Sequence, residues 1–264
     1  MSKMTPKVLV LTGYGINCDM ELAHAFKLAG AEAERVHLTD LINGTRKLSD
    51  FHMLALPGGF SFGDDIASGK VLANMLKYNL GEQIQEFIDD GNLIIGICNG
   101  FQAMVKMGLL PAFDDNYATQ EVTLTFNDSG RFEDRWVHLR GNKSSKCVFT
   151  KGINSIYLPV RHGEGKFVAK NQQVVARLKK GNQIVFQYVD SEGNLAGYPN
   201  NPNGSIENIA GICDETGRVF GMMPHPEAFQ HRTNHPRWTR EELPEEGAGV
   251  AIFRNAVGYM REKL

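Results

Sequence analysis

The chain has 264 residues, 42% of them hydrophobic, and its formal net charge at pH 7 is −2. These values support a folded core and give no overall positive field, so nucleic acid is not a predicted partner. No apolar run approaches the roughly 20 residues that cross a bilayer, and residues 1–15 show no signal-peptide layout. We therefore expect a cytoplasmic protein with no membrane partner.

The first hundred residues alternate apolar strands with amphipathic helices. Strands are expected at 7–13, 52–59 and 92–98, helices at 18–30 and 71–91, and the alternation repeats through 31–41. Such βαβ order predicts an α/β fold with a mostly parallel central sheet flanked by helices.

The second half is richer in short β-segments separated by turn residues. Strand-like pieces fall at 120–128, 135–140, 146–150, 155–160, 166–169 and 184–190. They predict a β-rich insertion, either as added strands or as a small second sheet. A hairpin is expected around Glu215, Thr216 and Gly217, and an amphipathic helix at 249–264. No interdomain linker is evident, so residues 1–264 are expected to form a single domain.

Cys98 stands at a predicted strand-to-helix turn, in the pattern Gly96-x-Cys98-x-Gly100. Small flanking residues allow a nucleophile to occupy a sharp, strained turn, and a helix N-terminus favours thiolate over thiol. The alternative is a small buried residue with no chemical role, which is the usual state of a free cysteine. Cys18, Cys147 and Cys213 form no CxxC pair, so we expect neither a disulfide framework nor a zinc site from them.

A base and its orienting carboxylate are available in PHPE, residues 224–227. Pro226 disfavours a helical conformation for His225, and in an extended segment Glu227 would lie on the same side as the imidazole. A single histidine in an unassigned sequence is more often structural. The combination of cysteine, histidine and glutamate is more specific.

Backbone donors for an oxyanion are expected in LPGGF, residues 56–60. A strand that ends in Gly58 and Gly59 leaves N–H groups at the carboxyl edge of the sheet, where α/β folds bind ligands. The Asn99 amide is the candidate second donor. The same Pro-Gly-Gly is also compatible with an ordinary turn.

The motifs GICNGFQ, PGGFSFGDD and PHPE, in this order, resemble the class I or triad glutamine amidotransferases, whose sheet is flavodoxin-like. More narrowly, the segments TGYGINCDMELAHAF, RWVHLR, PVRHGEGKF and YPNNPNGSIENIAGI are similar to the glutaminase subunits and domains of phosphoribosylformylglycinamidine synthases, in purine biosynthesis. This likeness covers nearly the whole chain.

The resemblance implies that Cys98 attacks the side-chain amide of L-glutamine and forms a γ-glutamyl thioester with release of ammonia. His225 would move the proton and Glu227 would orient it. Gly59 and Asn99 would form the oxyanion hole through their backbone amides.

The resemblance also implies substrate-binding residues. Gln102 matches the glutamine of the family's G-x-C-x-G-x-Q pattern, and with His162 and Gly163 it would hold the substrate. The neighbouring Arg161 and Glu164 are compatible both with a site role and with bracketing a glycine-rich turn.

In such systems the ammonia passes to a separate synthetase active site that uses ATP and magnesium. This sequence contains no G-x-x-x-x-G-K-[ST] loop, so we expect no cofactor in this chain. The implied partner is the large synthetase subunit, with a small accessory subunit in some organisms. The segments NDSGRFEDRW and HRTNHPRWTREELPEEGAG resemble the amidotransferase domain of the long, fused enzyme.

Three other interpretations remain open at this stage. The chain could be the glutaminase of a different synthetase or a γ-glutamyl hydrolase, or a regulatory module that keeps only the fold. PVRHGEGKF and YPNNPNGS disfavour the first two.

A metal site at His225, Glu227, His231 and His235 is not predicted, because the region lacks a helical HxxxH frame. The charged run at 239–247 is expected to be a solvated loop.

Overall fold

A nine-stranded sheet forms the centre of the molecule in the computed structural model, which describes residues 5–263. The strand order is β2-β1-β3-β4-β11-β10-β9-β6-β7. Its strands are β1 (Lys7–Thr12), β2 (Glu32–His37), β3 (Met53–Leu56), β4 (Leu93–Ile97), β6 (Glu133–Gly141), β7 (Ser155–His162), β9 (Ile184–Val189), β10 (Ile209–Cys213) and β11 (Val219–Met222). The helices are α1 (Asp19–Leu28), α2 (Leu38–Ile42), α3 (Lys70–Asp89), α4 (Asn99–Met107), α5 (Gln172–Lys180) and α6 (Val250–Lys263).

The sheet is parallel in one half and antiparallel in the other. The strands β2, β1, β3, β4 and β11 pair in parallel. Buried on both faces, β1, β3 and β4 are almost wholly apolar, as doubly covered strands must be. The β10–β11 pair is antiparallel and turns the sheet into its second half, which confirms the predicted hairpin around residues 215–217.

The β-rich insertion takes both of the forms expected from the sequence. Strands β9, β6 and β7 extend the main sheet with antiparallel pairs. Strands β5 (Val122–Thr125) and β8 (Lys166–Ala169) form a separate two-stranded sheet. The predicted α/β class with a parallel core is therefore confirmed.

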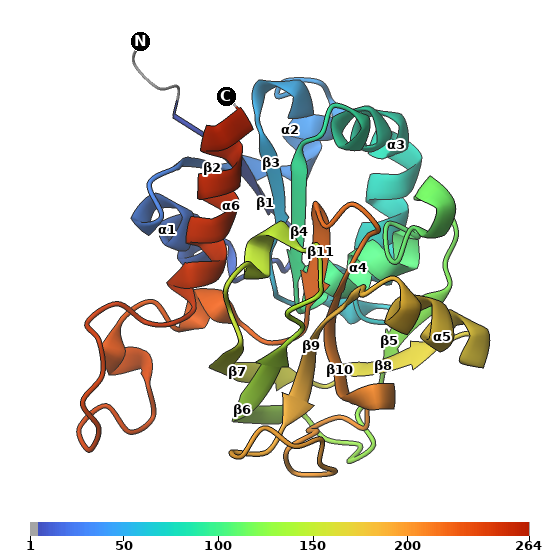
Figure 1. Cartoon of the computed structure of the whole chain (residues 1–264). Coiled ribbons are helices and arrows are strands. Elements are labelled where there is room, and N and C mark those ends of the chain that lie inside the picture. Colours follow the sequence, from blue (N-terminus) through green and yellow to red (C-terminus); the bar gives the residue numbers. More distant parts are fainter. Residues whose placement is uncertain (1–4, 264) are drawn as a thin grey trace.

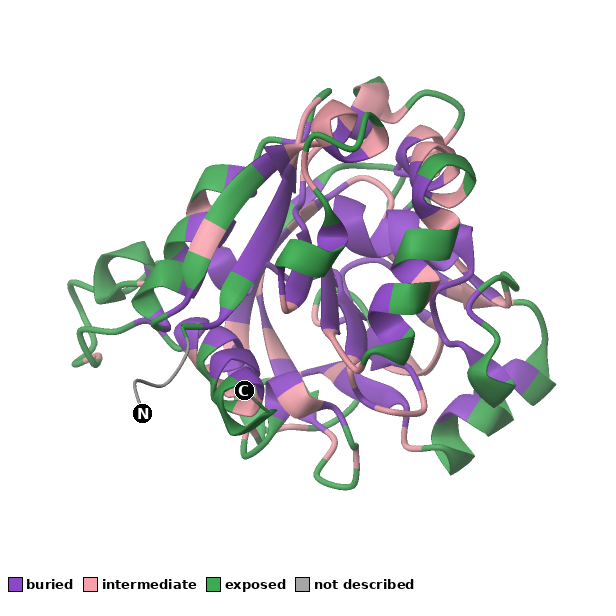
Figure 2. Ribbon diagram, turned by 90° about the horizontal axis from the view of Figure 1, so that it is seen from above, coloured by how far each residue is buried: buried purple, intermediate pink, exposed green. Residues whose placement is uncertain are grey.

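Helices cover both faces of the parallel strands. Figure 1 shows α1 and α6 together on one side and α3 and α4 on the other, with the antiparallel extension projecting from one end. Buried residues follow the strands and the inner helix faces, whereas the outer helix faces are exposed (Figure 2). Among residues 5–263 there is no helix of the length and apolarity needed to cross a membrane.

Two local predictions were wrong or missing. Residues 146–150 were expected as a strand, but Val148–Thr150 form a 3₁₀ turn packed beside α6. Helix α5 was not predicted, although Asn171 caps it through a bond from the Val174 N–H. Val174, Val175 and Leu178 form its buried stripe at helical spacing.

Candidate active site

Four parallel strands deliver the site residues to one edge of the sheet. The chain leaves the carboxyl ends of β1, β3, β4 and β11 at Thr12, Leu56, Ile97 and Met222. Parallel neighbours end at the same edge, so the segments that follow these strands come together there. These segments contain Cys18, Gly58–Gly59, Cys98 and His225–Glu227.

Cys98 occupies the strained turn that its flanking glycines predict. Its φ of 51° and ψ of −108° are unusual for a residue with a side chain, and its N–H donates to the Met222 carbonyl at 2.8 Å. A Cβ at Gly96 would lie 2.3 Å from the Met104 sulfur, and one at Gly100 would lie 2.0 Å from the Leu56 carbonyl oxygen. The two glycines therefore allow β3, β4 and α4 to approach closely enough to hold the turn.

His225 and Glu227 form a buried pair. The imidazole Nδ1 lies 2.5 Å from Glu227 Oε1, and both residues are 2% exposed. The segment is not extended as predicted: Pro226 begins a 3₁₀ turn, Pro226–Ala228, directly after His225. The tight turn brings the carboxylate to the ring by a different local geometry, and the expected pairing of the two side chains is found.

The environment of His225 favours its protonated form. Burial is the largest single effect and lowers the pKa of the imidazole, but the Glu227 carboxylate and the Cys98 and Cys18 sulfurs together raise it by more. The net pKa lies well above the ordinary value. Nε2 has no hydrogen-bond partner in residues 5–263, so this side of the ring is free for a reacting group. The Cys98 thiol donates to the Arg161 carbonyl at 3.6 Å.

The Gly58–Gly59 turn closes one wall of the site. A Cβ at Gly58 would lie 2.8 Å from His225 Cε1 and 3.4 Å from Cys98 Cβ. The space beside these two side chains therefore admits a glycine and no larger residue. Gly59 has a φ of +148° and bridges to Ile16, and the described residues offer no acceptor to its N–H. Asn99 is the first residue of α4, so its backbone N–H makes no hydrogen bond within the helix.

Gln102 is used inside the protein rather than presented to the site. Its Nε2 donates to the Glu164 carbonyl at 2.6 Å, and its Oε1 accepts from Asn99 Nδ2 at 2.9 Å. Asn99 Nδ2 also donates to Asp64, whose half-buried carboxyl has a raised pKa because of desolvation. The glutamine thus positions the segment that follows β7.

His162 and Gly163 are organised by Asn127, a residue that the sequence analysis missed. Asn127 accepts from Gly165 N–H through Oδ1, which also lies 3.1 Å from His162 Nδ1. The backbone N–H of Asn127 donates to the Gly163 carbonyl at 2.9 Å. Burial lowers the pKa of His162 to about 3, with a further lowering from the charge of His225, so the His162 ring is neutral.

The asparagine-rich motif at 198–205 supports the same segment from outside. Asn203 Nδ2 donates to the Gly165 carbonyl at 2.8 Å, and Ser205 Oγ accepts from the Phe167 N–H at 2.9 Å. Two motifs that are separate in sequence, PVRHGEGKF and YPNNPNGS, therefore form one structural unit beside Cys98.

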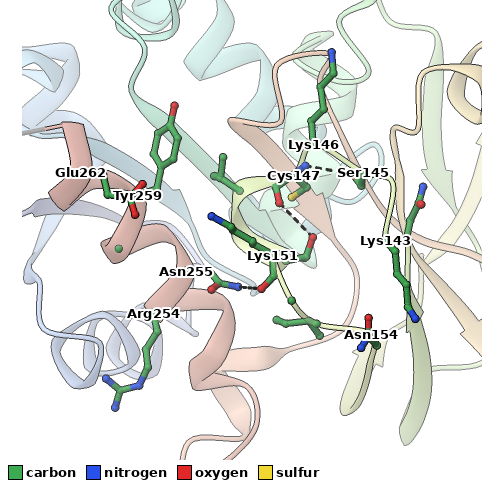
Figure 3. A pocket seen from close by; sticks show the side chains of 16 residues that line it. Lys143, Ser145, Lys146, Cys147, Lys151, Asn154, Arg254, Asn255, Tyr259 and Glu262 are labelled. Atoms are coloured by element: carbon green, nitrogen blue, oxygen red, sulfur yellow. Dashed lines mark hydrogen bonds between the residues drawn. The ribbon is translucent and has the colours of Figure 1, made fainter.

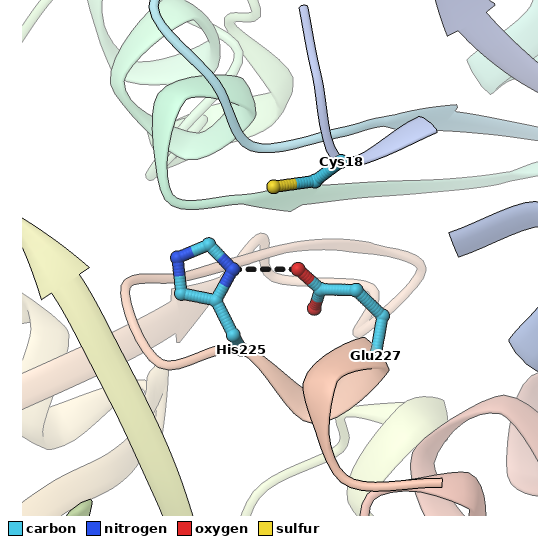
Figure 4. Close-up of side chains that lie close together, drawn as sticks. All are labelled: Cys18, His225 and Glu227. Carbon is cyan, nitrogen blue, oxygen red and sulfur yellow. Dashed lines mark hydrogen bonds and ion pairs between the residues drawn. The ribbon is translucent and has the colours of Figure 1, made fainter. Parts of the chain in front are cut away.

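Cys18, from which neither a disulfide nor a zinc site was expected, lies within the site. Its sulfur lies beside the His225–Glu227 pair in Figure 4 and would be 3.3 Å from a Cβ at Gly58. Its N–H donates to the Gly58 carbonyl at 3.2 Å. The signal that could have found it is its place after β1, at the same carboxyl edge as Cys98.

The other two histidines of the region do not join the site. His231 is hydrogen-bonded to Thr233 and its Nε2 lies 3.9 Å from Glu245. His235 packs among the rings of Trp136, Tyr157 and Phe229. The run at 239–247 is largely exposed, as expected.

Two hollows are not lined by Cys98 itself. The hollow drawn in Figure 3, between the 3₁₀ turn at 148–150 and α6, is lined in part by Lys143, Lys146 and Arg254, whose side chains point in different directions. They do not converge on one anion position. A second hollow borders Arg161 and Glu227 on the side of α1.

Comparison with known proteins agrees with this geometry. The family of the CobB/CobQ-like glutamine amidotransferase domain matches residues 5–260. The "Phosphoribosylformylglycinamidine synthase subunit PurQ" of Dehalococcoides mccartyi is 50% identical over 264 residues, covering 99% of this chain and 100% of the relative. The protein of the same name from Methanococcus maripaludis is 47% identical over 274 residues, with coverage of 99% and 100%.

A solved structure gives the same result. A chain of "Structure of PurLQS from Thermotoga maritima" superposes with a TM-score of 0.73 at 31% identity, covering 97% of this chain and 100% of that one. The two relatives are named as separate subunits and are matched over their full length. The chain belongs to the CobB/CobQ-like glutamine amidotransferase family and, within it, to the PurQ subunits of phosphoribosylformylglycinamidine synthase.

Proposed function

We propose that this chain hydrolyses L-glutamine with Cys98 as nucleophile, His225 as proton carrier and Glu227 as its orienting carboxylate. It supplies the ammonia to a phosphoribosylformylglycinamidine synthase in purine biosynthesis, which converts formylglycinamide ribonucleotide to the amidine. The observation that carries the proposal is the His225–Glu227 pair at 2.5 Å, with its unpartnered Nε2 beside the strained Cys98 turn.

In the first half-reaction the Cys98 thiolate attacks the side-chain carbonyl carbon of glutamine. A carbon–sulfur bond forms and the carbonyl electron pair moves to oxygen, where the Gly59 and Asn99 N–H groups stabilise the charge. The carbon–nitrogen bond then breaks. The leaving nitrogen takes the proton of His225 and departs as ammonia, which leaves a γ-glutamyl thioester.

In the second half-reaction water replaces the sulfur. His225 Nε2 takes a proton from water as the water oxygen attacks the thioester carbon. The carbon–sulfur bond breaks, the thiolate is restored and glutamate leaves. Glu227 accepts a hydrogen bond from Nδ1–H of His225, so Nε2 is the nitrogen that exchanges protons in both steps.

The substrate lies against the segment around His162 and Gly163 in this proposal. The neutral His162 ring has a buried Nε2 with no partner among the described residues, so it can bond to a polar group of the substrate. Gln102 acts indirectly, because its amide holds the Glu164 carbonyl.

We further propose that the synthesis itself takes place on a large synthetase subunit, with a small accessory subunit in the assembly. ATP and magnesium belong to that partner, and this chain needs no cofactor of its own. The name of the Thermotoga maritima structure, PurLQS, supports an assembly of several subunits.

The test compares two nitrogen sources in the assembled complex. Cys98→Ala is expected to lower glutamine-dependent synthesis by at least about 10³-fold, because the nucleophile is gone, while ammonia-dependent synthesis persists. Cys213→Ala is a matched control, since Cys213 is also buried but lies on β10, outside the site. Undiminished glutamine use by Cys98→Ala would refute the proposed chemistry.

A further inference from the structure

Cys18 adds a third ligand-type side chain to the His225–Glu227 pair. One sulfur, one ring nitrogen and one carboxylate oxygen of these residues lie within 4.8 Å of one another, and all three side chains are buried. Figure 4 shows the Cys18 sulfur on one side of the hydrogen bond that joins His225 and Glu227. They form the one such cluster of three found in the described part of the chain.

We propose that Cys18, His225 and Glu227 form an inhibitory binding site for a thiophilic divalent ion, best matched by Zn²⁺. Sulfur, imidazole nitrogen and carboxylate oxygen are the three donor types that zinc takes in proteins. Around a tetrahedral zinc, ligands at about 2.0–2.3 Å lie roughly 3.3–3.7 Å apart, so only small side-chain movements bring these atoms to an ion. The proposal rests on the proposed function, because the ion takes the base of that reaction.

The charges of the donor set match this ion. Zinc takes cysteine as a thiolate, histidine as a neutral imidazole and glutamate as a carboxylate, so binding releases protons from the site. The Cys18 thiolate and the Glu227 carboxylate then balance the two positive charges of the ion, and the buried site stays neutral.

The backbone holds the ligands close together before any ion arrives. Cys18 N–H is bonded to the Gly58 carbonyl, and its own carbonyl accepts from Leu22 in the first turn of α1. His225 N–H is bonded to the Pro159 carbonyl at 2.8 Å. Glu227 Oε2 has no partner among residues 5–263, so it is available as a second carboxylate donor. Such preformed ligands bind an ion with little loss of conformational freedom.

Bound zinc would stop the glutaminase reaction by occupying the imidazole and fixing Glu227 as a ligand. His225 could then neither give a proton to ammonia nor take one from water. Ammonia-dependent synthesis on the partner would continue, since it uses none of these groups.

The first experiment measures zinc binding to the full chain by metal analysis after gel filtration. We expect one Zn²⁺ per wild-type chain, removable by a chelator, and an affinity at least about tenfold weaker in Cys18→Ala and in Glu227→Gln. Cys213→Ala and Cys98→Ala should bind as the wild type does. The proposal would be overturned if zinc binding were lost in Cys98→Ala and kept in Cys18→Ala, or if the wild-type chain retained no zinc at all.

A second measurement does not depend on the variants being folded. Co²⁺ bound to the wild-type chain should give a thiolate-to-cobalt charge-transfer band that zinc abolishes. Absence of this band would count against Cys18 as a ligand.

Zinc binding needs no catalysis, so the zinc site and the glutaminase function can fail separately. Glutamine use that zinc inhibits equally in wild type and Cys18→Ser, each normalised to its own chelator-treated rate, would refute the site and leave the glutaminase assignment intact. Zinc taken up through Cys18, together with no glutamine use by the assembled complex after chelator treatment, would refute the glutaminase assignment alone.

Discussion

The side-chain nitrogen of Gln102 lies 2.6 Å from the backbone carbonyl oxygen of Glu164. This bond joins the helix that starts directly after Cys98 to the segment that carries His162. It connects the nucleophile and the expected substrate-binding residues, which are more than sixty positions apart in the chain. Two features that the sequence indicated separately are thus parts of one rigid unit.

Gln102→Leu should loosen this unit. The change leaves the Glu164 carbonyl and Asn99 Nδ2 each short of one hydrogen-bond partner, at a cost of about 1–3 kcal/mol in the free energy of unfolding. Misplacement of the 162–164 segment should lower glutaminase kcat/KM by about 10- to 100-fold. Denaturant unfolding and steady-state kinetics measure the two effects. Gln85→Leu on α3, whose hydrogen bond to Asp89 is exposed to solvent, is the control, and equal behaviour of the two variants would remove Gln102 from the account.

The core of the site followed from local sequence signals. Cys98 was recognisable because the turn needs Gly96 and Gly100, and the β-α alternation placed the ends of four strands at one edge. Cys18 and Asn127 were not recognisable as site residues. Their importance comes from contacts with residues 35 to more than 200 positions away, which no local pattern encodes. The 3₁₀ turn at Pro226 likewise depends on packing between His225 and its neighbours.

Gly58→Ala should damage catalysis through a single methyl group. The added Cβ would lie 2.8 Å from His225 Cε1, so the imidazole must move away from its reacting position. We expect glutaminase activity to fall by about 100-fold or more and unfolding free energy to fall by about 1–3 kcal/mol from overpacking. Gly258→Ala on α6 is the matched control, because nothing lies within 4 Å of its added Cβ. Wild-type activity in Gly58→Ala would contradict the close packing around the imidazole.

Glu227→Gln should slow both half-reactions without removing the nucleophile. The amide keeps the shape of the carboxylate but no longer stabilises a charged His225, so kcat should fall by about 10²- to 10⁴-fold. The loss should remain smaller than that of Cys98→Ala. Single-turnover measurements of glutamate release test this order, with the exposed Glu82→Gln as control. A Glu227→Gln enzyme of full activity would show that the pair at 2.5 Å has no catalytic role.

His162 should make the folded state less stable in acid. Its pKa is about 3 in the folded protein, chiefly because of burial, against about 6.5 when unfolded. The unfolded state therefore binds the extra proton first, and stability from this group is complete above pH 6.5 and is lost as pH falls towards 3. The loss is about 1.4 kcal/mol per pH unit within this range.

The measurement is the free energy of unfolding at pH 7.5 and pH 5.0 in wild type and in His162→Gln, which cannot titrate. The wild type should lose about 2 kcal/mol more than the variant between these values. Parallel losses in the two proteins would mean that the His162 ring is not held neutral by burial.

The most direct test of the central claim is covalent labelling by a glutamine-mimicking electrophile, followed by peptide mass spectrometry. The account predicts one adduct per chain, at Cys98, with the three other buried cysteines unmodified. Absence of an adduct, or equal modification of Cys18, Cys98, Cys147 and Cys213, would show that no activated thiol meets glutamine at this edge of the sheet.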